Sequence, residues 1–133
     1  MLRFMAAIYV LDGTRVRTLE DFWRVVLDAF DSPGRQYFGR NLDAFADCLN
    51  GGPGGPGADD YIVEWRDHDV SRENLGYSET VRQLELRLAR CHPSNRAVFE
   101  NRLAAARDQR GQTVFDQLVE IFESRAPGVL RLR

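Results

Sequence analysis

The chain has few of the residues that build a disulfide scaffold, a metal centre or a membrane span. Its two cysteines, Cys48 and Cys91, are too few for a disulfide framework. Its two histidines, His68 and His92, do not fall in the spacing of a metal-ligand set or a catalytic triad. No segment approaches the roughly 18 consecutive apolar residues of a membrane-spanning helix. We therefore expect neither a metalloenzyme, nor a triad hydrolase, nor a membrane protein.

Lysine is absent, because all 18 basic residues are arginine, and we interpret this as compositional bias. The formal net charge of −2 is too small to indicate a nucleic-acid binder. The glycine-rich stretch at 51–57, GGPGGPG, has neither the Gly-Lys-Ser/Thr ending nor the following helix of a phosphate-binding loop. It predicts a flexible loop, and no cofactor is expected.

The composition is that of one soluble globular domain over residues 1–133, with 44% hydrophobic and 29% charged residues. The N-terminal apolar run Phe4–Leu11 is about as short as the apolar part of a signal peptide can be. Asp12-Gly13 follows it, where a cleavage site would need small residues, so we do not expect a signal peptide. We therefore expect a cytoplasmic protein. Cys48 lies within an apolar pattern and is expected to be a buried, reduced thiol.

The first half of the chain predicts a strand and two helices. The run Phe4–Leu11 predicts a buried strand, ended by the turn Asp12-Gly13. Thr18 is expected to cap a helix, with Asp21 as its capping-box partner. The apolar stripe of that helix has intervals of three and four residues and comprises Leu19, Phe22, Trp23, Val26, Leu27 and Phe30.

A second, shorter helix is predicted over 42–50, capped by Asn41 and ended by Gly51. Tyr61–Trp65 predicts the second strand, and residues 66–77 are expected to be irregular. Three further helices are predicted from their apolar residues. The first contains Val81, Leu84, Leu88 and Cys91, and the second, capped by Ser94 or Asn95, contains Val98, Phe99, Leu103 and Ala106. The third contains Val114, Phe115, Leu118, Val119 and Phe122.

Pro127-Gly128 turns the chain into a last predicted strand, Val129–Leu132. Strands that alternate with helices pair in parallel and are joined by right-handed crossovers. We therefore expect an α/β fold with a small three-stranded parallel sheet packed against helices.

Two carboxylates distinguish the segment Gln36–Gly51, QYFGRNLDAFADCLNG. Asp43 and Asp47 lie four residues apart and therefore share one helix face. Like charges at that spacing destabilise a helix by roughly 0.2–0.5 kcal/mol. No basic residue lies three or four positions from Asp47. The pair contributes little to the local fold, which favours a binding partner as its explanation, with a solvated helix face as the alternative.

The run Tyr37–Leu49, YFGRNLDAFADCL, closely resembles the matching segment of the barstar family, the intracellular protein inhibitors of barnase-type ribonucleases. The resemblance extends to Val10–Gly13 with Val16, to Leu19 and Asp21, to Glu64–Arg66 and to Val114–Leu132, roughly two-thirds of the chain. It implies a barstar-like fold. It also implies an inhibitor and not an enzyme, with an acidic helix and preceding loop that occlude the active site of a bacterial ribonuclease.

The same resemblance implies roles for single residues. Asp47 matches the acid that occupies the phosphate site of the enzyme, and Asp43 matches a neighbouring contact acid. Tyr37 matches an aromatic that packs against a catalytic histidine of the enzyme, and Gly39 allows close backbone approach. The other implied partner-binding residues are Phe38, Asn41, Ala46 and Glu120; Phe38 is also a candidate for the core, as is Trp65.

The chain departs from the family pattern in four places. Arg40 replaces an acid, Ala46 replaces a tryptophan, the loop at 51–57 is richer in glycine, and residues 72–110 form a helical insertion. The expected partner is therefore a barnase-like or other guanyl-type bacterial ribonuclease, and the protein would serve as its immunity protein.

The insertion leaves an alternative function open. Residues 72–110 contain eight arginines and five acids, a formal charge of +3. A basic amphipathic hairpin of this kind would suit an RNA-associated or regulatory adaptor. The favoured interpretation is that its apolar stripes extend the core and its arginines face water. A cation site formed by Asp43 and Asp47 with Asp59 or Asp60 is disfavoured, because one helix supplies only two ligands at that spacing.

Overall fold

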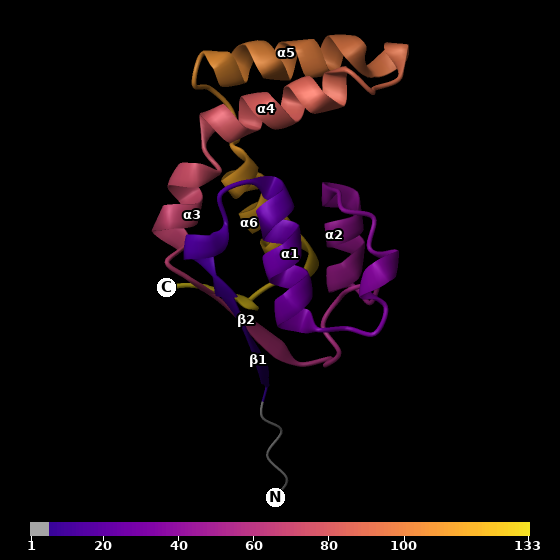
Figure 1. Cartoon of the computed structure of the whole chain (residues 1–133), viewed down its shortest axis with the longest axis vertical. Helices are drawn as coiled ribbons and strands as arrows, with labels where there is room; N and C mark the ends of the chain where they lie inside the picture. The colour runs from indigo at the N-terminus through magenta and orange to yellow at the C-terminus, as the bar shows by residue number, and fades with distance from the viewer. Residues whose placement is uncertain (1–5) are drawn as a thin grey trace, which may run out of the picture.

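The computed structural model describes residues 6–133 and contains a three-stranded parallel sheet in the order β1-β2-β3 (Figure 1). The strands are β1 (Ala7–Asp12), β2 (Tyr61–Arg66) and β3 (Leu130–Leu132). Ala7 lies opposite Tyr61, and Val63 lies opposite Leu130. The predicted α/β class and parallel sheet are confirmed. Phe4 and Met5, the start of the first predicted strand, lie outside the described residues.

The first strand is buried on one face only, so the expectation of a fully buried strand is wrong. Leu11 is completely buried, whereas the side chains of Ile8 and Val10 are 59% and 39% exposed. β1 is an edge strand that pairs only with β2, and its alternate side chains point to opposite faces of the sheet. The apolar run therefore has one face in the core and one face in solvent.

The first helix, α1 (Leu19–Phe30), has the predicted capping box and apolar stripe. The Thr18 hydroxyl accepts a hydrogen bond from the Asp21 amide at 3.1 Å, and the Asp21 carboxylate accepts one from the Thr18 amide at 3.2 Å. All six predicted stripe residues are buried. Phe22 meets Phe45 at 5.3 Å and Trp65 at 5.2 Å between ring centroids, which ties α1 to the next helix and to the sheet.

Two more helices pack around this aromatic core: α2 (Leu42–Leu49) and α6 (Val114–Arg125). The rings of Phe45 and Phe122 meet edge to face at 5.1 Å. α6 begins with a second capping box, formed by Thr113 and Asp116. Its sequence signal, Thr-x-x-Asp before an apolar run, is the same as that of α1.

The segment after β2 is helical, so the expectation that residues 66–77 are irregular is wrong. α3 (His68–Asn74) buries one side chain, Ser71, and is followed by the buried Leu75. The Ser71 hydroxyl accepts from Trp65 Nε1 at 3.0 Å and donates to the Gly13 carbonyl at 2.8 Å. A helix anchored by a buried serine has no apolar stripe, which is why periodicity missed it. Trp65 is fully buried, as predicted.

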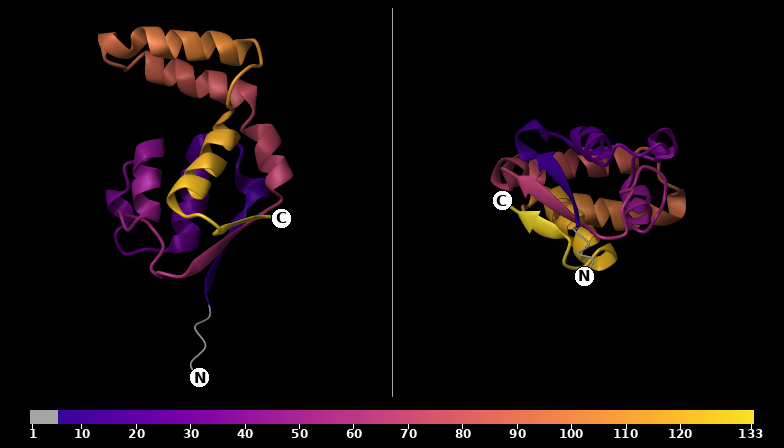
Figure 2. Two further views of the ribbon diagram at one scale, coloured as in Figure 1. Left: turned by 180° about the vertical axis from the view of Figure 1, so that it is seen from behind. Right: turned by 90° about the horizontal axis from the view of Figure 1, so that it is seen from below.

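The remaining helices, α4 (Tyr77–Leu88) and α5 (Arg96–Arg107), form a hairpin (Figures 1 and 2). It lies across one end of the molecule, beyond the ends of α1, α2 and α6. Its buried residues Leu84, Leu103 and Ala106 form a cluster separate from the main core. The expectation that these stripes extend the core is therefore wrong, because the two helices bury their apolar faces mainly against each other.

Short 3₁₀ turns complete the chain at η1 (Gly13–Arg15), η2 (Arg35–Tyr37) and η3 (Pro93–Asn95). None of the helices in the described part of the chain is long and apolar enough to cross a membrane.

Candidate functional site

Asp43 and Asp47 are both exposed on α2. Within residues 6–133, neither carboxylate has an arginine, histidine or lysine nitrogen within 4 Å. By contrast, Glu79, Glu85 and Glu100 on other helices each form an ion pair with an arginine. The two acids of α2 therefore present uncompensated negative charge to solvent.

The two acids differ in their relation to the helix dipole. Asp43 lies in the first turn, where negative charge is favourable next to the unpaired amides. Asp47 lies in the last turn, and its own carbonyl accepts hydrogen bonds from Asn50 and Gly52. A negative side chain at the C-terminal end of a helix costs about 0.3–1 kcal/mol. The free protein therefore carries Asp47 at a cost to its stability.

The loop before α2 divides its two aromatics between solvent and core. Tyr37 is 73% exposed, the most exposed of the large apolar and aromatic side chains described. Phe38 is 7% exposed, and its ring lies 5.4 Å from that of Trp23. Phe38 thus anchors the loop from inside, and Tyr37 projects from it.

Asn41 connects this loop to α2. Its side-chain oxygen accepts from the Ala44 amide at 2.7 Å, the predicted N-cap, and its amide nitrogen donates to the Gly39 carbonyl at 3.1 Å. A Cβ on Gly39 would lie 3.2 Å from the Ala44 Cβ and 3.3 Å from the Asn41 side-chain nitrogen. The small residue at 39 therefore keeps the cap intact and leaves the backbone there open to solvent.

The glycine-rich segment at 51–57 is a loop, as predicted, and it packs against the C-terminal end of α2. Gly54 and Gly55 are buried, and the Gly52 amide donates to the Asp47 carbonyl at 2.8 Å. A Cβ on Gly55 would lie 1.9 Å from the Cys48 carbonyl oxygen. Gly51 has a φ of +98°, as expected at the residue that ends a helix. The missing side chains allow this backbone to approach α2.

Cys48 is a fully buried free thiol on the inner face of α2, as predicted. Burial, with a smaller contribution from the neighbouring Asp47 carboxylate, raises its pKa to about 12. The thiol therefore stays protonated at neutral pH and acts as a packing group.

Two residues assigned to partner binding by resemblance lie apart from this surface. Ala46 is 8% exposed and faces inward from α2. Glu120 is exposed on α6, where it accepts a hydrogen bond from Gln112 and lines a shallow depression with Arg72 and Phe115. The structure therefore leaves Tyr37, Gly39, Asn41, Asp43 and Asp47 exposed on α2 and the segment before it, with Phe38 buried, and places Glu120 on a different helix, α6.

A comparison with protein families identifies the family of the chain. The chain matches the family model Barstar (barnase inhibitor) over residues 6–92, more than half of its length. The chain belongs to the barstar family. The members of this family inhibit barnase-type ribonucleases and are not enzymes. The matched residues include β1, α1, α2, β2 and the loop before α2, and they extend through α3 and α4.

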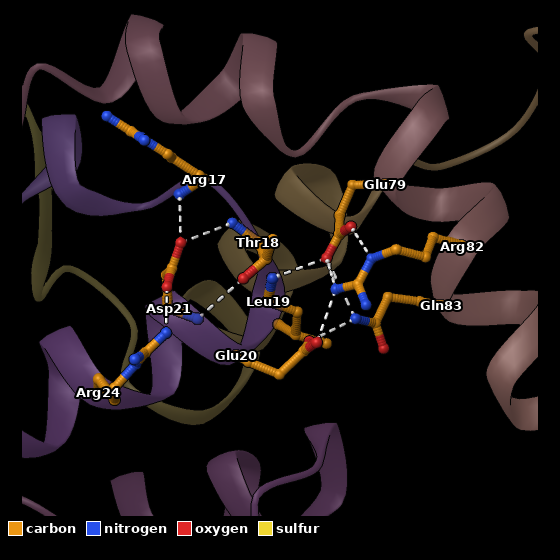
Figure 3. Close-up of polar contacts among 9 residues, drawn as sticks. All are labelled: Arg17, Thr18, Leu19, Glu20, Asp21, Arg24, Glu79, Arg82 and Gln83. Carbon is orange, nitrogen blue, oxygen red and sulfur yellow. Dashed lines mark hydrogen bonds and ion pairs between the residues drawn. The ribbon is translucent and has the colours of Figure 1, made fainter.

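Sequence reasoning missed a clamp that fixes the hairpin to the main core. The Glu79 side chain on α4 is 5% exposed and accepts from the Leu19 amide at 2.8 Å, at the first turn of α1 (Figure 3). Arg82 bonds Glu79 at 2.6 Å and Glu20 at 2.7 Å. Thr80 adds a second tie, because its hydroxyl accepts from the Val114 amide at 2.9 Å, at the start of α6. Glu79 lies between Ser78 and Thr80, so no apolar context in the sequence marked it as buried.

In the part of the chain that the structure describes, no three His, Cys, Asp or Glu side chains gather closely enough to hold a metal ion.

Proposed function

We propose that this barstar-family protein inhibits a bacterial ribonuclease, barnase-like or of another guanyl type, by placing α2 and its preceding loop in the active-site cleft. The observation that carries this proposal is Asp47, an exposed acid kept without a cation at the unfavourable end of its helix. Asp47 lowers the stability of the free protein, and a partner that supplies a positive charge would explain why an acid stands at this position. The protein would act in the bacterial cytoplasm as the immunity protein of that enzyme.

Electrostatics supports an acid in this position. The cleft of a ribonuclease binds phosphodiesters and therefore holds cationic groups. An acid about 4 Å from one such group gains about 4 kcal/mol at an effective dielectric constant of about 20, before desolvation is counted. This exceeds the roughly 0.2–0.5 kcal/mol of repulsion between Asp43 and Asp47 along the helix.

The other exposed residues suit the same contact. Tyr37 offers an aromatic ring, the residue type enriched at the centre of interfaces. Gly39 allows a partner to approach the backbone. Asn41, Phe38 and Ala46 have local structural partners, so their contribution would be to hold the loop and helix in shape. Glu120 would at most touch the periphery.

The test is inhibition of RNA cleavage by purified barnase, and by other guanyl-type ribonucleases, with the full chain and with Asp47→Ala. We expect the wild type to inhibit at least one enzyme of this class. We expect Asp47→Ala to raise the inhibition constant about a hundredfold or more, because it leaves a cation of the partner buried and unpaired. Asp59→Ala, which removes an exposed acid outside α2, is the matched control. An Asp47→Ala protein as potent as the wild type would refute the proposal.

A further inference from the structure

The hairpin and the main core enclose an open groove of about 930 Å³. One wall is formed by α4, α5 and the residues after them. The other wall is formed by the first turns of α1 and α2, including Glu20, Asn41 and Asp43. The groove is therefore continuous with the α2 surface assigned above to ribonuclease binding.

The hairpin wall carries positive charge that the protein itself leaves unpaired. Arg87, Arg90 and Arg102 all line the groove. Among residues 6–133, none of the three has a carboxylate oxygen within 4 Å. Arg87 instead lies over the Phe99 ring at 4.7 Å, and Arg90 donates to the Leu86 carbonyl. These cations would pair with an anionic occupant.

Three helices also begin at this groove. The first turns of α1, α2 and α6 contribute Leu19, Leu42 and Val114 to its lining. Figures 1 and 2 show the hairpin lying across this end of the three helices. The N-terminal end of a helix carries a partial positive charge. Acids in these first turns, Asp21, Asp43 and Asp116 among them, offset this charge, so the arginines are the main cationic feature of the groove.

The lining favours a polypeptide over RNA. Single-stranded nucleic acids stack their bases on exposed aromatic rings. The only aromatic residue in this lining is Trp23, which is 2% exposed. Apolar side chains, the exposed Leu86 among them, belong to the same lining and suit a polypeptide that carries apolar as well as acidic residues.

We infer that the groove receives an acidic, partly apolar segment of the partner protein, which pairs with Arg87, Arg90 and Arg102. This inference rests on the proposed function, because the segment would belong to the ribonuclease whose cleft receives α2. The partner then meets two charged surfaces of opposite sign, the acids of α2 and the arginines of the hairpin. Recognition by both surfaces would make the hairpin a determinant of which ribonuclease is bound.

A first experiment tests the groove without the ribonuclease. Hexaglutamate and hexauridylate are titrated into the full chain at about 0.01 M salt, where screening is weak, and backbone amide signals are followed by NMR. Hexaglutamate should shift the amides of Arg87, Arg102 and Asn41. The variant Arg87→Gln/Arg102→Gln should lose these shifts. The matched control Arg96→Gln/Arg107→Gln removes two hairpin arginines that do not line the groove and should keep them.

No shift with hexaglutamate, or tighter binding of hexauridylate at the same amides, would overturn the inference; the second result would assign the groove to RNA. Thermal melting of each variant shows whether the hairpin remains folded.

A second experiment measures inhibition of the ribonuclease that the wild type blocks. Arg87→Gln/Arg102→Gln should weaken inhibition about three- to tenfold, and Arg96→Gln/Arg107→Gln should leave it unchanged. If Asp47→Ala impairs inhibition and Arg87→Gln/Arg102→Gln does not, the inference about the groove is wrong and the proposed function stands. If the reverse holds, the acidic helix is not the inhibitory element and the hairpin contact stands.

Discussion

The two acids of α2 differ in their effect on the stability of the free protein. Asp47 is exposed, lacks a cationic neighbour among the described residues and lies in the last turn of its helix, whereas Asp43 lies in the favourable first turn. If Asp47 binds the ribonuclease as proposed, binding and stability place opposite requirements on this residue. The glycines at 52, 54 and 55, by contrast, are explained by packing, because a Cβ at each position would lie too close to a neighbouring atom.

Replacing Asp47 by Asn should stabilise the free protein while weakening inhibition. The change removes a negative charge from the C-terminal end of α2 and the repulsion from Asp43, worth together about 0.5–1.5 kcal/mol at low salt. Calorimetry at about 0.01 M salt should find a melting temperature higher by a few degrees. Asp43→Asn is the control, since it removes a favourable first-turn charge. An Asp47→Asn protein less stable than the wild type would show that the carboxylate has a structural role.

A methyl group at Gly55 should be strongly destabilising. Its Cβ would lie 1.9 Å from the Cys48 carbonyl oxygen, so the loop must leave the end of α2. We expect Gly55→Ala to lower the free energy of unfolding by about 2 kcal/mol or more, measured by urea denaturation. Gly57→Ala is the matched control, because no atom lies within 4 Å of its added Cβ, and it should change stability by less than about 1 kcal/mol. Equal effects at the two positions would contradict this account of the loop.

Among the elements, the α4–α5 hairpin depends on its first turn for its position. Its own apolar cluster of Leu84, Leu103 and Ala106 holds the two helices together but does not join them to the main core. The joint is polar: Glu79 caps α1, Thr80 accepts from α6, and the Tyr77 hydroxyl donates to the Gly111 carbonyl at 2.9 Å. A polar joint of this kind is sensitive to protonation.

The stability of the clamp should fall in acid. Burial opposes ionisation of Glu79, but hydrogen bonds from Arg82, from the Leu19 amide and from Gln83, with the charge of Arg82, outweigh it and hold its pKa below the ordinary value of 4.5. A carboxyl whose pKa is lower in the folded state stabilises the fold above its unfolded pKa, and this contribution is lost as the pH falls through the folded pKa.

Glu79→Gln should therefore reduce stability at pH 7 by about 1–3 kcal/mol, because its amide cannot satisfy the Arg82 guanidinium. Urea titrations from pH 7 to pH 3 should give a flatter pH dependence for this variant than for the wild type. Glu85→Gln removes an exposed acid from the same helix and should preserve the slope. A wild-type slope in Glu79→Gln would show that the acid does not contribute to the pH dependence.

At the scale of the whole molecule, residues 72–110 carry a net positive charge and the rest of the chain carries a net negative charge. Residues 72–110 have eight arginines against five acids, a formal +3, in a chain of net charge −2, so the rest of the chain carries −5. The hairpin, which makes up most of this basic segment, lies at one end of the molecule (Figure 1). A ribonuclease approaching α2 would therefore meet a local field larger than the net charge suggests.

Association with the ribonuclease should depend on salt through the acids of α2. The Debye length falls from about 30 Å at 0.01 M salt to about 10 Å at 0.1 M, so steering weakens over that range. We expect the association rate constant to fall several-fold, with a smaller change in dissociation, when stopped-flow mixing is repeated across these salt concentrations. Asp43→Asn/Asp47→Asn should associate more slowly and with a flatter salt dependence. Rates and slopes equal to those of the wild type would mean that another surface meets the partner.

Local chemistry allowed much of this protein to be predicted before its structure. The capping box of Thr18 and Asp21, the Asn41 cap and the buried stripe of α1 depend on neighbours within one or two helical turns, and such patterns are visible in sequence. The motif around Asp43 and Asp47 likewise lies on one short segment. The parallel sheet followed from the alternation of strands and helices.

Contacts between distant residues decided the rest. α3 was missed because its anchor is a serine bonded to Gly13 and Trp65. The packing of the glycine loop on α2 could not be predicted, because the lack of a Cβ matters only once the neighbouring atom is known, here the Cys48 carbonyl oxygen. The place of the hairpin depends on Glu79 meeting Leu19, 60 positions earlier in the chain. Sequence periodicity shows which face of a helix or strand is apolar. Only the tertiary structure determines which residues lie against a polar side chain such as Glu79 or against a glycine that lacks a Cβ.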